Sequence, residues 1–351
     1  MSMIEELIRQ ADKNGASDVH LIFGLPPMNR LAGRLVPMNR EPLTDEICDA
    51  LARDLVGEAQ QHRLLEGGEL DGATTLGGVR IRINLFRQQG HTSASLRLLS
   101  DHIPALETLG LPSKIEELTE EERGIILVTG ETGSGKSTTL AAMIDRINHR
   151  RAEHIITLED PIEYLYTPDR SIFDQREIGR DTASFSSGLR AALREDPDII
   201  LVGEMRDLDT IETALTAAET GHLVFATLHT GSASDSIDRM VGVFPEARQR
   251  QIRMQVSMTL KAVLSQQLLP MQNGRGRVCA CELMVVTPAI RNLIREGKTP
   301  QIENALATSA SEGAVTMDNA ILSLCRAGKI SFDTAWRAAH DPAYVERAIR
   351  H

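Results

Sequence analysis

The stretch GETGSGKS at residues 130–137 decides the fold of this chain. It satisfies the pattern G-x-x-x-x-G-K-[ST] at every fixed position, directly after the apolar run IILV (125–128). A helical pattern of apolar residues follows from Leu140. Glycines in such a strand–loop–helix context let successive backbone N–H groups face phosphate oxygens at a helix N-terminus. The alternative is a glycine-rich turn that only caps a helix, and the complete motif in this context favours phosphate binding.

Different residues of this loop are expected to bind different parts of a nucleoside triphosphate and its metal ion. Lys136 is expected to reach the β- and γ-phosphates, and Ser137 to bind Mg²⁺. The positions predicted to bind ATP are Gly130, Thr132, Gly133, Ser134, Gly135, Lys136, Ser137 and Thr138.

Four short apolar runs separated by helical patterns predict a parallel sheet that is buried on both faces. Ligands bind beyond the carboxyl ends of such strands, so the residues after each run are where chemistry is expected. From Gly231 onward the chain is mainly helical in pattern, with one further strand candidate at residues 278–286. The four runs are residues 125–128, 155–158, 199–202 and 223–228.

Acidic residues follow two of these runs. Glu204 in GEMRD stands just past the strand at 199–202, where an acid can hold Mg²⁺ through water; a solvated loop acid is the alternative. The run at 155–158 leads into LEDPIEY, which carries Glu159, Asp160 and Glu163. Hydrolysis needs a group that orients and deprotonates the attacking water. One of these three carboxylates is the natural candidate, and the residues alone do not choose among them.

Two histidines bracket the run at 223–228. His222 precedes it and His229 follows it, and a histidine at a strand end can sense the γ-phosphate or relay to a neighbouring subunit. A hydrogen-bonded structural histidine is the alternative with about equal weight. Zinc is not expected, because no companion set of ligands is visible.

The first hundred residues predict a small mixed α/β domain. An amphipathic helix starts near Ile4 and is stopped by Gly15, a strand candidate lies at residues 19–23, and a helical stretch runs from about 45 to 65. Residues 79–86 then alternate between apolar and polar, which predicts a half-buried strand. Residues 95–99 are a candidate partner strand.

Two arginines of these strands, Arg82 and Arg97, are expected on the solvent-side face. They are either ordinary surface side chains or the arginines that stabilise γ-phosphate charge from outside the phosphate-binding loop.

Composition limits the classes of function. The chain has 351 residues, a net charge of −11 and few aromatic residues, which disfavours a surface for nucleic acid. Its four cysteines do not form a disulfide framework, and the sequence shows no secretory signal and no membrane-spanning run. A cytosolic location follows as an expectation. We expect a domain over residues 1–100, a proline-containing linker over 101–114 and a second domain over 115–351.

The motifs together make the chain resemble the PilT-type retraction ATPases of bacterial type IV pili, within the secretion-ATPase superfamily. The resemblance rests on IITLEDPIEY (155–164), GEMRD (203–207), TGHLVFATLHT (220–230) and AIRNLIRE (289–296), and runs almost end to end. It implies a PAS-like α+β N-terminal domain and a RecA-like ATPase domain with a helical C-terminal part.

The same resemblance implies roles for individual residues. It makes Glu163 the catalytic base, Glu204 the acid on the magnesium side, and His222 and His229 the family's histidine box. It matches Arg82 and Arg97 to the arginines that the N-terminal domain brings to the nucleotide.

The resemblance further implies a homohexamer that drives pilus retraction against an inner-membrane platform protein, at the cytoplasmic face of that membrane and without inserting into it. Three alternatives stay open: an accessory retraction ATPase, a type II/IV secretion or extension ATPase, and a DNA translocase on the same core.

Overall fold

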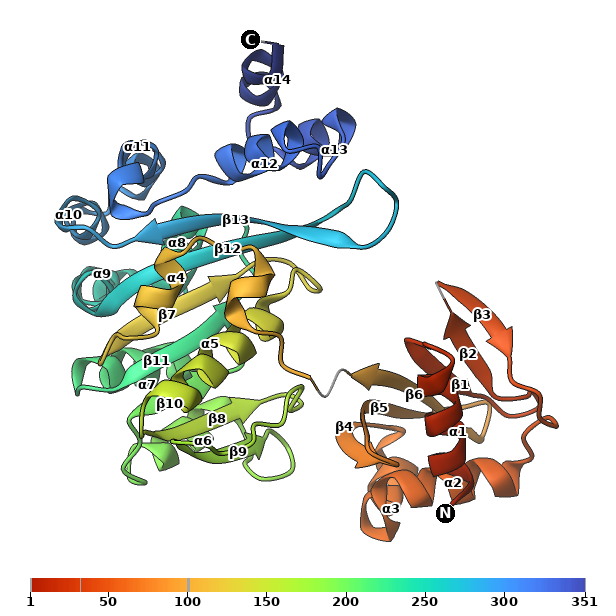
Figure 1. The fold of residues 1–351 in the computed structure, drawn as a ribbon. Coiled ribbons are helices and arrows are strands. Elements are labelled where there is room, and N and C mark those ends of the chain that lie inside the picture. Colours follow the sequence, from red (N-terminus) through yellow and green to blue (C-terminus); the bar gives the residue numbers. More distant parts are fainter. Residues whose placement is uncertain (1, 32, 100–101, 351) are drawn as a thin grey trace. The chain divides into compact units, whose positions relative to one another are not determined.

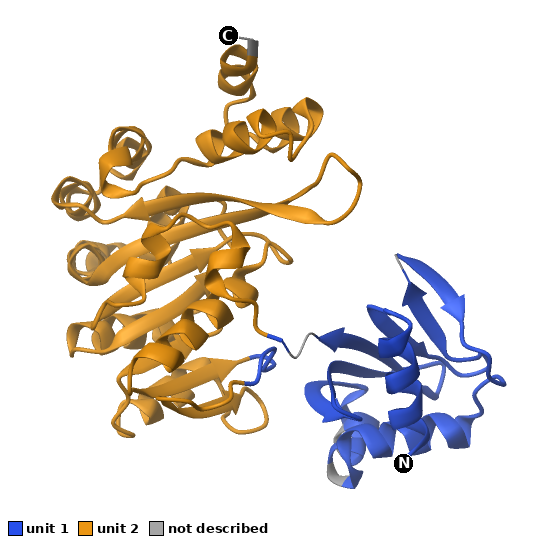
Figure 2. Ribbon diagram, viewed as in Figure 1, with its two compact units in different colours: residues 1–102, 160–165 blue, residues 103–159, 166–351 orange. Residues whose placement is uncertain are grey.

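The computed structural model describes residues 2–31, 33–99 and 102–350. Contacts divide the chain into two compact units (Figure 2), which are described one at a time. Unit 1 holds residues 1–102 together with 160–165, and unit 2 holds 103–159 and 166–351. Residues 100 and 101, the last of the expected first domain and the first of the expected linker, lie outside the described residues. The domain limits drawn from the sequence did not foresee that 160–165 group with unit 1, and they stay predictions.

Unit 1 is an antiparallel sheet with helices (Figure 1). The strand order is β3-β2-β1-β6-β5-β4. Helix α1 begins with a capping box in which Ser2 and Glu5 satisfy each other's backbone N–H groups, and its apolar face is fully buried. The elements are α1 (Met3–Lys13), β1 (Asp18–Leu21), β2 (Met28–Leu31), β3 (Arg34–Pro37), α2 (Asp45–Val56), α3 (Glu58–Gly67), β4 (Glu69–Leu76), β5 (Val79–Gln88) and β6 (His91–Leu99).

The helical stretch expected from 45 to 65 is two helices, so that prediction was wrong in its continuity. Helix α2 ends and α3 begins at Gly57, whose φ of 79° lies in the left-handed region that a helix interior cannot use. The predicted alternation over 79–86 is confirmed in β5, where Ile81, Ile83 and Leu85 are buried. Its predicted partner is confirmed as β6, which pairs with it antiparallel.

Unit 2 contains a seven-stranded sheet, counted over the described residues, in the order β13-β12-β7-β11-β10-β8-β9. All neighbouring strands are parallel except β13, which runs antiparallel to β12. The strands are β7 (Gly124–Thr129), β8 (His154–Glu159), β9 (Ile172–Glu177), β10 (Ile199–Val202), β11 (Leu223–Leu228), β12 (Leu260–Pro270) and β13 (Arg277–Val285).

All four predicted runs are strands of this sheet, and β13 confirms the further strand candidate. The apolar-run criterion missed two strands. β9 is an edge strand whose sequence IFDQRE is largely polar. β12 lies in the region expected to be mainly helical, and the polar residues Ser265 and Gln266 interrupt its apolar residues although both are buried.

Helices cover this sheet, and a helical part follows β13 (Figure 1). Helices α7 to α10 contribute to the main core together with alternate residues of the central strands, such as Ile125, Leu127 and Val224. The helices are α4 (Lys114–Leu118), α5 (Lys136–Arg150), α6 (Phe185–Ala192), α7 (Leu208–Glu219), α8 (Ala233–Gly242), α9 (Glu246–Thr259), α10 (Pro288–Glu296), α11 (Ile302–Thr308), α12 (Met317–Arg326), α13 (Phe332–Ala338) and α14 (Pro342–Arg350).

Helix α10 starts with a proline and ends at a glycine. Pro288 occupies the first turn, and Gly297 ends the helix with a φ of 71°. Among the described residues, no helix is long and apolar enough to cross a membrane.

Candidate functional site

The phosphate-binding loop connects β7 to α5 in unit 2. Gly130 has a φ of 138°, and a Cβ atom built on it would lie 2.4 Å from the carbonyl oxygen of Gln266 and 2.6 Å from Ser134 Oγ. Neither distance is possible for a real side chain, so only glycine fits where the loop leaves the strand. Gly133 and Gly135 follow with φ values of 82° and 96°. The three glycines therefore allow this loop a curled backbone conformation that other residues rarely adopt.

Two polar groups in this loop fit an anionic ligand. The Lys136 side chain is buried, and its Nζ donates to the carbonyl oxygens of Gly130 (2.8 Å) and Glu131 (3.0 Å). Ser134 Oγ is buried and has no hydrogen-bond partner among the described residues. A buried hydroxyl without a partner costs free energy unless a ligand satisfies it. The N-terminus of α5 begins at Lys136, so its positive dipole end faces the same loop.

An acid and a histidine meet at the ends of two neighbouring strands. Glu204 follows β10 and His229 follows β11, and His229 Nε2 lies 3.4 Å from Glu204 Oε1. Arg206 Nε lies 2.6 Å from the same oxygen. Burial alone would raise the pKa of Glu204, but Arg206 and His229 outweigh it, and the net pKa is lowered. Glu204 is therefore a carboxylate at neutral pH.

Backbone hydrogen bonds fix the strand end that carries Glu204. Gly203 N donates to the carbonyl oxygen of Leu158 (2.8 Å) on one side, and Thr227 Oγ1 donates to the carbonyl oxygen of Gly203 (2.5 Å) on the other. Met205 N donates back to the carbonyl oxygen of Thr227 (3.1 Å). Glu204 thus sits on a segment tied to both neighbouring strands, as a precisely placed charged group requires.

His222 lies at the other end of β11 from this cluster. It precedes β11 whereas His229 follows it, and six strand residues separate their positions by roughly 20 Å. Its Nδ1 interacts with the carbonyl oxygen of Ala217 (2.9 Å) and Thr220 Oγ1 (3.2 Å). These contacts suit a structural histidine, and the role that the resemblance gives to His222 stays a prediction.

The three carboxylates after β8 differ in their surroundings. Glu159 Oε1 accepts from Thr157 Oγ1 (2.7 Å) and Gln175 Nε2 (3.5 Å), so it serves contacts within unit 2. Asp160 and Glu163 belong to the segment that groups with unit 1. The assignment of Glu163 as the base stays a prediction.

Arg82 and Arg97 are directly opposite each other on β5 and β6 of unit 1. Arg97 is largely exposed, and its Nε contacts Asp18 Oδ1 at 3.1 Å. The pKa of Asp18 is lowered: burial would raise it, but the Ser17 hydroxyl and Arg97 prevail. The expected solvent-side position is thus confirmed for Arg97, and Arg82 on the same face is partly exposed.

Sequence reasoning missed Arg80, which lies on the same face two residues before Arg82. It is 9 % exposed, and its Nη2 donates to the carbonyl oxygen of Ile162 (3.0 Å) within unit 1. This contact holds the residue immediately before Glu163. The alternating pattern of β5 contained Arg80, but nothing in that pattern distinguished a buried arginine from an exposed one.

The donor atoms near the loop suit a hard cation. Ser137, at the second position of α5, supplies a hydroxyl and Glu204 supplies an ionised carboxylate. Mg²⁺ prefers oxygen ligands, keeps several waters and needs only one or two protein groups beside the phosphates. Within the described ranges, no group of three or more His, Cys, Asp or Glu side chains is arranged to hold a metal by itself. This donor set fits Mg²⁺ bound together with a nucleotide.

Comparison with known proteins then identifies the family. The model of the family "Type II/IV secretion system protein" matches residues 1–337. This chain belongs to that family. It is 47 % identical over 340 residues to the type IV pilus retraction ATPase PilT of Pseudomonas aeruginosa, covering 97 % of this chain and 98 % of that protein. It is 44 % identical to a twitching motility protein of Neisseria gonorrhoeae, covering 96 % and 91 % of the two chains.

A solved structure gives the same result. The crystal structure of the pilus retraction motor PilT with bound ADP matches with a TM-score of 0.92 and 46 % identity, covering 99 % of both chains. The resemblance to PilT-type ATPases that the motifs predicted is confirmed, and so is the fold class of a small α+β N-terminal domain before a P-loop domain with a helical C-terminal part.

Proposed function

We propose that this family member is an ATP-hydrolysing motor that drives retraction of type IV pili. The observation that carries the proposal is the P-loop of residues 130–137 beside the ionised acid and histidine at the ends of β10 and β11. Similarity along nearly the whole chain to PilT, a type IV pilus retraction ATPase, supports it. The stretch AIRNLIRE (289–296), one of the motifs that carry the resemblance to retraction ATPases, forms helix α10.

The chain's own groups divide the reaction in the following way. The backbone N–H groups of 130–137 and Lys136 bind the phosphates of ATP, and Ser134 Oγ gains a hydrogen-bond partner there. Ser137 and Glu204 hold Mg²⁺, which when bound neutralises part of the phosphate charge. Glu163 orients the attacking water and accepts its proton. Arg82 and Arg97 stabilise charge on the transferred phosphoryl group, as arginines outside the P-loop do in related motors.

His229 transmits changes at the bound nucleotide to the rest of unit 2. Its contact with Glu204 competes with that of Arg206 for the same carboxylate oxygen. Any ligand that changes the charge beside Glu204 changes the balance between the two. His222 has no part in the proposal, because its ring is used at the other end of the strand.

The motor works as a homohexamer against an inner-membrane platform protein, at the cytoplasmic face of the membrane. Full-length similarity to PilT supports this assembly. ATP hydrolysis would change how the units of neighbouring subunits engage, and the ring would pass the displacement to the platform.

The decisive experiment has a biochemical and a cellular arm. The purified chain is expected to hydrolyse ATP in Mg²⁺ and to lose at least about 100-fold in turnover when Lys136 is changed to alanine. Deletion in the host is expected to leave cells with more surface pili and without twitching motility. Cells without pili would instead assign the motor to extension, and an inactive wild-type hexamer would refute the ATPase proposal.

The alternative within the family is an accessory retraction or secretion ATPase. It is favoured by 37 % identity over 332 residues to the type IV pilus ATPase PilU of Pseudomonas aeruginosa. Normal retraction in a deletion strain that keeps a second motor would support that role.

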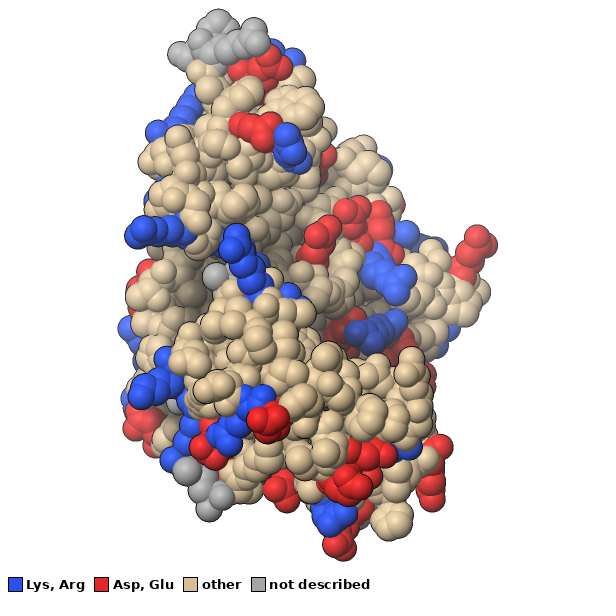
Figure 3. All heavy atoms as spheres, turned by 90° about the vertical axis from the view of Figure 1, so that its right-hand side faces the viewer, with Lys and Arg blue, Asp and Glu red and all other residues tan. Residues whose placement is uncertain are grey.

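A DNA translocase is disfavoured by the charge distribution. On the face of the described residues drawn in Figure 3, basic and acidic side chains are interspersed rather than gathered in one basic stripe. Hydrolysis that is not stimulated by DNA would exclude this alternative.

A further inference from the structure

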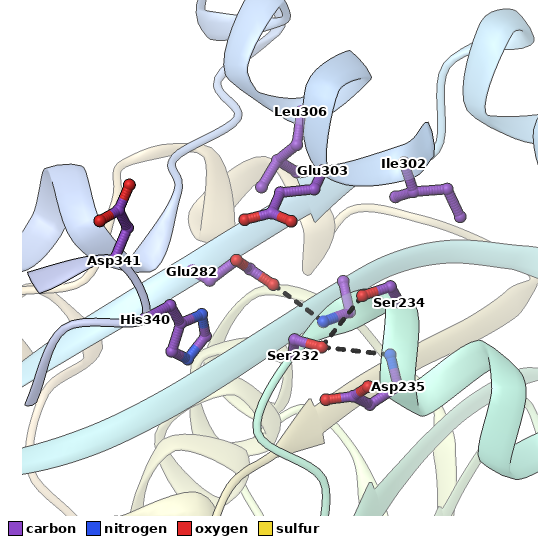
Figure 4. Close-up of a pocket in the computed structure, with 10 residues that line it drawn as sticks. Ser232, Ser234, Asp235, Glu282, Ile302, Glu303, Leu306, His340 and Asp341 are labelled. Carbon is purple, nitrogen blue, oxygen red and sulfur yellow. Dashed lines mark hydrogen bonds between the residues drawn. The ribbon is translucent and has the colours of Figure 1, made fainter. Parts of the chain in front are cut away.

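A buried carboxylate lies outside the set of residues used so far. Glu282, on β13, is 5 % exposed and borders a cavity of about 490 Å³ in unit 2. Its Oε1 accepts a hydrogen bond from the backbone N–H of Ala233 at 2.8 Å (Figure 4). Carboxylates are rarely this buried unless hydrogen bonds satisfy their oxygens, and the Ala233 N–H offsets part of the cost of burying Glu282.

Glu282 holds the N-terminus of helix α8. Ala233, whose backbone N–H donates to Glu282 Oε1, is the first residue of α8, where the helix presents N–H groups and the positive end of its dipole. Burial raises the pKa of Glu282, while the backbone N–H groups of Ala233 and Met317 and the charge of His340 oppose the rise and Glu303 adds to it. The next residue of β13, Leu283, exchanges backbone hydrogen bonds with Val315 (2.8 Å and 3.0 Å), just before α12 begins. The strand that carries Glu282 is therefore joined both to the start of α8 and to the segment that leads into α12.

The segment that Glu282 anchors leads directly to the candidate site. Residues 229–232 connect the end of β11 to the start of α8, and they include His229, whose Nε2 lies 3.4 Å from Glu204 Oε1. The segment is short and internally braced: Thr230 Oγ1 bonds to Ser236 Oγ (2.7 Å), which bonds to the carbonyl oxygen of Ser232 (2.6 Å). Fixing Ala233 therefore fixes the far end of the segment that carries His229.

We propose that Glu282 is a positioning residue for ATP hydrolysis, which sets His229 against Glu204 by holding the start of α8. The inference rests on the proposed ATPase function. It assigns Glu282 no contact with the nucleotide: its effect passes through the segment 229–232. Because β13 also pairs with Val315 just before α12, a load on the C-terminal helices reaches His229 through β13 and Glu282.

The competing view is that Glu282 only stabilises the fold, and a double-mutant cycle separates the two. Glu282→Ala is expected to lower kcat about 10-fold with the KM for ATP changed less than about twofold, since the phosphate-binding loop is untouched. In a protein that already carries His229→Ala, adding the same substitution is expected to lower kcat by less than about a further twofold. Both substitutions disturb the same contact, that between His229 and Glu204. Glu282→Gln, which keeps an acceptor oxygen, is expected to retain more activity than Glu282→Ala.

A matched control removes another buried polar contact to α8. Thr299 Oγ1, which is 4 % exposed, donates to Asp238 Oδ1 (2.8 Å), five residues along α8 from Ala233. Thr299→Val is expected to lower the melting temperature without changing kcat. Should Glu282→Ala not yield folded hexamer, Glu282→Asp, which shortens the side chain by one methylene and keeps its charge, takes its place in the cycle.

Three outcomes overturn the proposal. They are fully multiplicative effects of the Glu282 and His229 substitutions, wild-type kcat in the folded Glu282 variant, or equal losses in the Glu282 variant and in Thr299→Val. An inactive wild-type chain would be a different result, since it removes the ATPase function itself.

Discussion

Glu204 and His229 stand at the carboxyl ends of adjacent parallel strands, with His229 Nε2 3.4 Å from Glu204 Oε1. The two residues are far apart in the chain's numbering, and the register of β10 against β11 is what makes them neighbours. Glu204 also contacts Arg206, so the same carboxylate oxygen faces both an arginine and a histidine. The pair thus places a carboxylate and an imidazole together at the carboxyl edge of the unit 2 sheet.

Gly130→Ala is expected to abolish nucleotide binding and to destabilise the protein by about 1–3 kcal/mol, as overpacking does. The added Cβ would lie 2.4 Å from the carbonyl oxygen of Gln266, and backbone cannot move aside cheaply. Binding of a fluorescent ATP analogue and urea unfolding measure the two effects. Gly242→Ala is the control, since a Cβ there meets nothing within 4 Å and the residue lies in helix α8. Wild-type binding by Gly130→Ala would contradict the inference that only glycine fits at position 130 of the phosphate-binding loop.

Glu163→Gln is expected to lower kcat by about 10²–10⁴ while ATP still binds, because the variant cannot accept a proton from water. Glu159→Gln and Asp160→Asn are the matched controls. Glu159 already accepts from Thr157 Oγ1 at 2.7 Å, so its substitution is expected to affect stability more than turnover. Steady-state hydrolysis with a parallel binding assay distinguishes the three carboxylates. A large kcat loss confined to Glu159→Gln or Asp160→Asn would move the role of base to that residue.

Arg82→Ala is expected to lower kcat about 10³-fold and to leave nucleotide binding within a few-fold, since arginines of this kind act on transition-state charge. The measurement is the same pair of assays. Arg87, on the same strand, donates to Thr92 Oγ1 at 2.9 Å and supplies the control: Arg87→Ala is expected to keep its turnover. Equal, small effects of both substitutions would show that Arg82 is an ordinary surface arginine.

The stability of the β8–β9 edge is expected to depend on pH through His154. Burial would lower the pKa of His154, but Asp174 and the carbonyl oxygens of Asp196 and Glu195 prevail, so the pKa is raised from its ordinary value of 6.5. A raised folded-state pKa means that the stabilisation is complete below the unfolded pKa. It is then lost as pH rises through the folded pKa.

His154→Gln tests this dependence. The free-energy difference between wild type and variant is expected to be largest below pH 6.5 and to shrink above it, by a few tenths to about 1 kcal/mol. Urea unfolding from about pH 6 to 8 follows it. Asp174→Asn is expected to remove the same pH-dependent part, and a difference that grows with pH would contradict the sign.

The sequence by itself determined the elements whose signal is local. The P-loop follows from the spacing of Gly130, Gly135 and Lys136, because the motif specifies its own backbone. The parallel strands β7, β8, β10 and β11 follow from apolar runs that only a doubly covered sheet explains. The family followed as well, since several motifs at distinct strand ends rarely coincide by chance.

The tertiary structure alone decided which residues of like type share a site. His222 and His229 are equivalent in the sequence, yet the length of β11 places them at opposite edges of the sheet. Arg80 and Arg82 occupy equivalent positions in the alternating pattern of β5, and only packing in the folded chain buries Arg80 against the carbonyl oxygen of Ile162. Glu282 lies in an unremarkable strand until the fold brings the N-terminus of α8 to it. Pairings across such sequence separations depend on strand register and burial, and these are properties of the folded chain rather than of any local pattern.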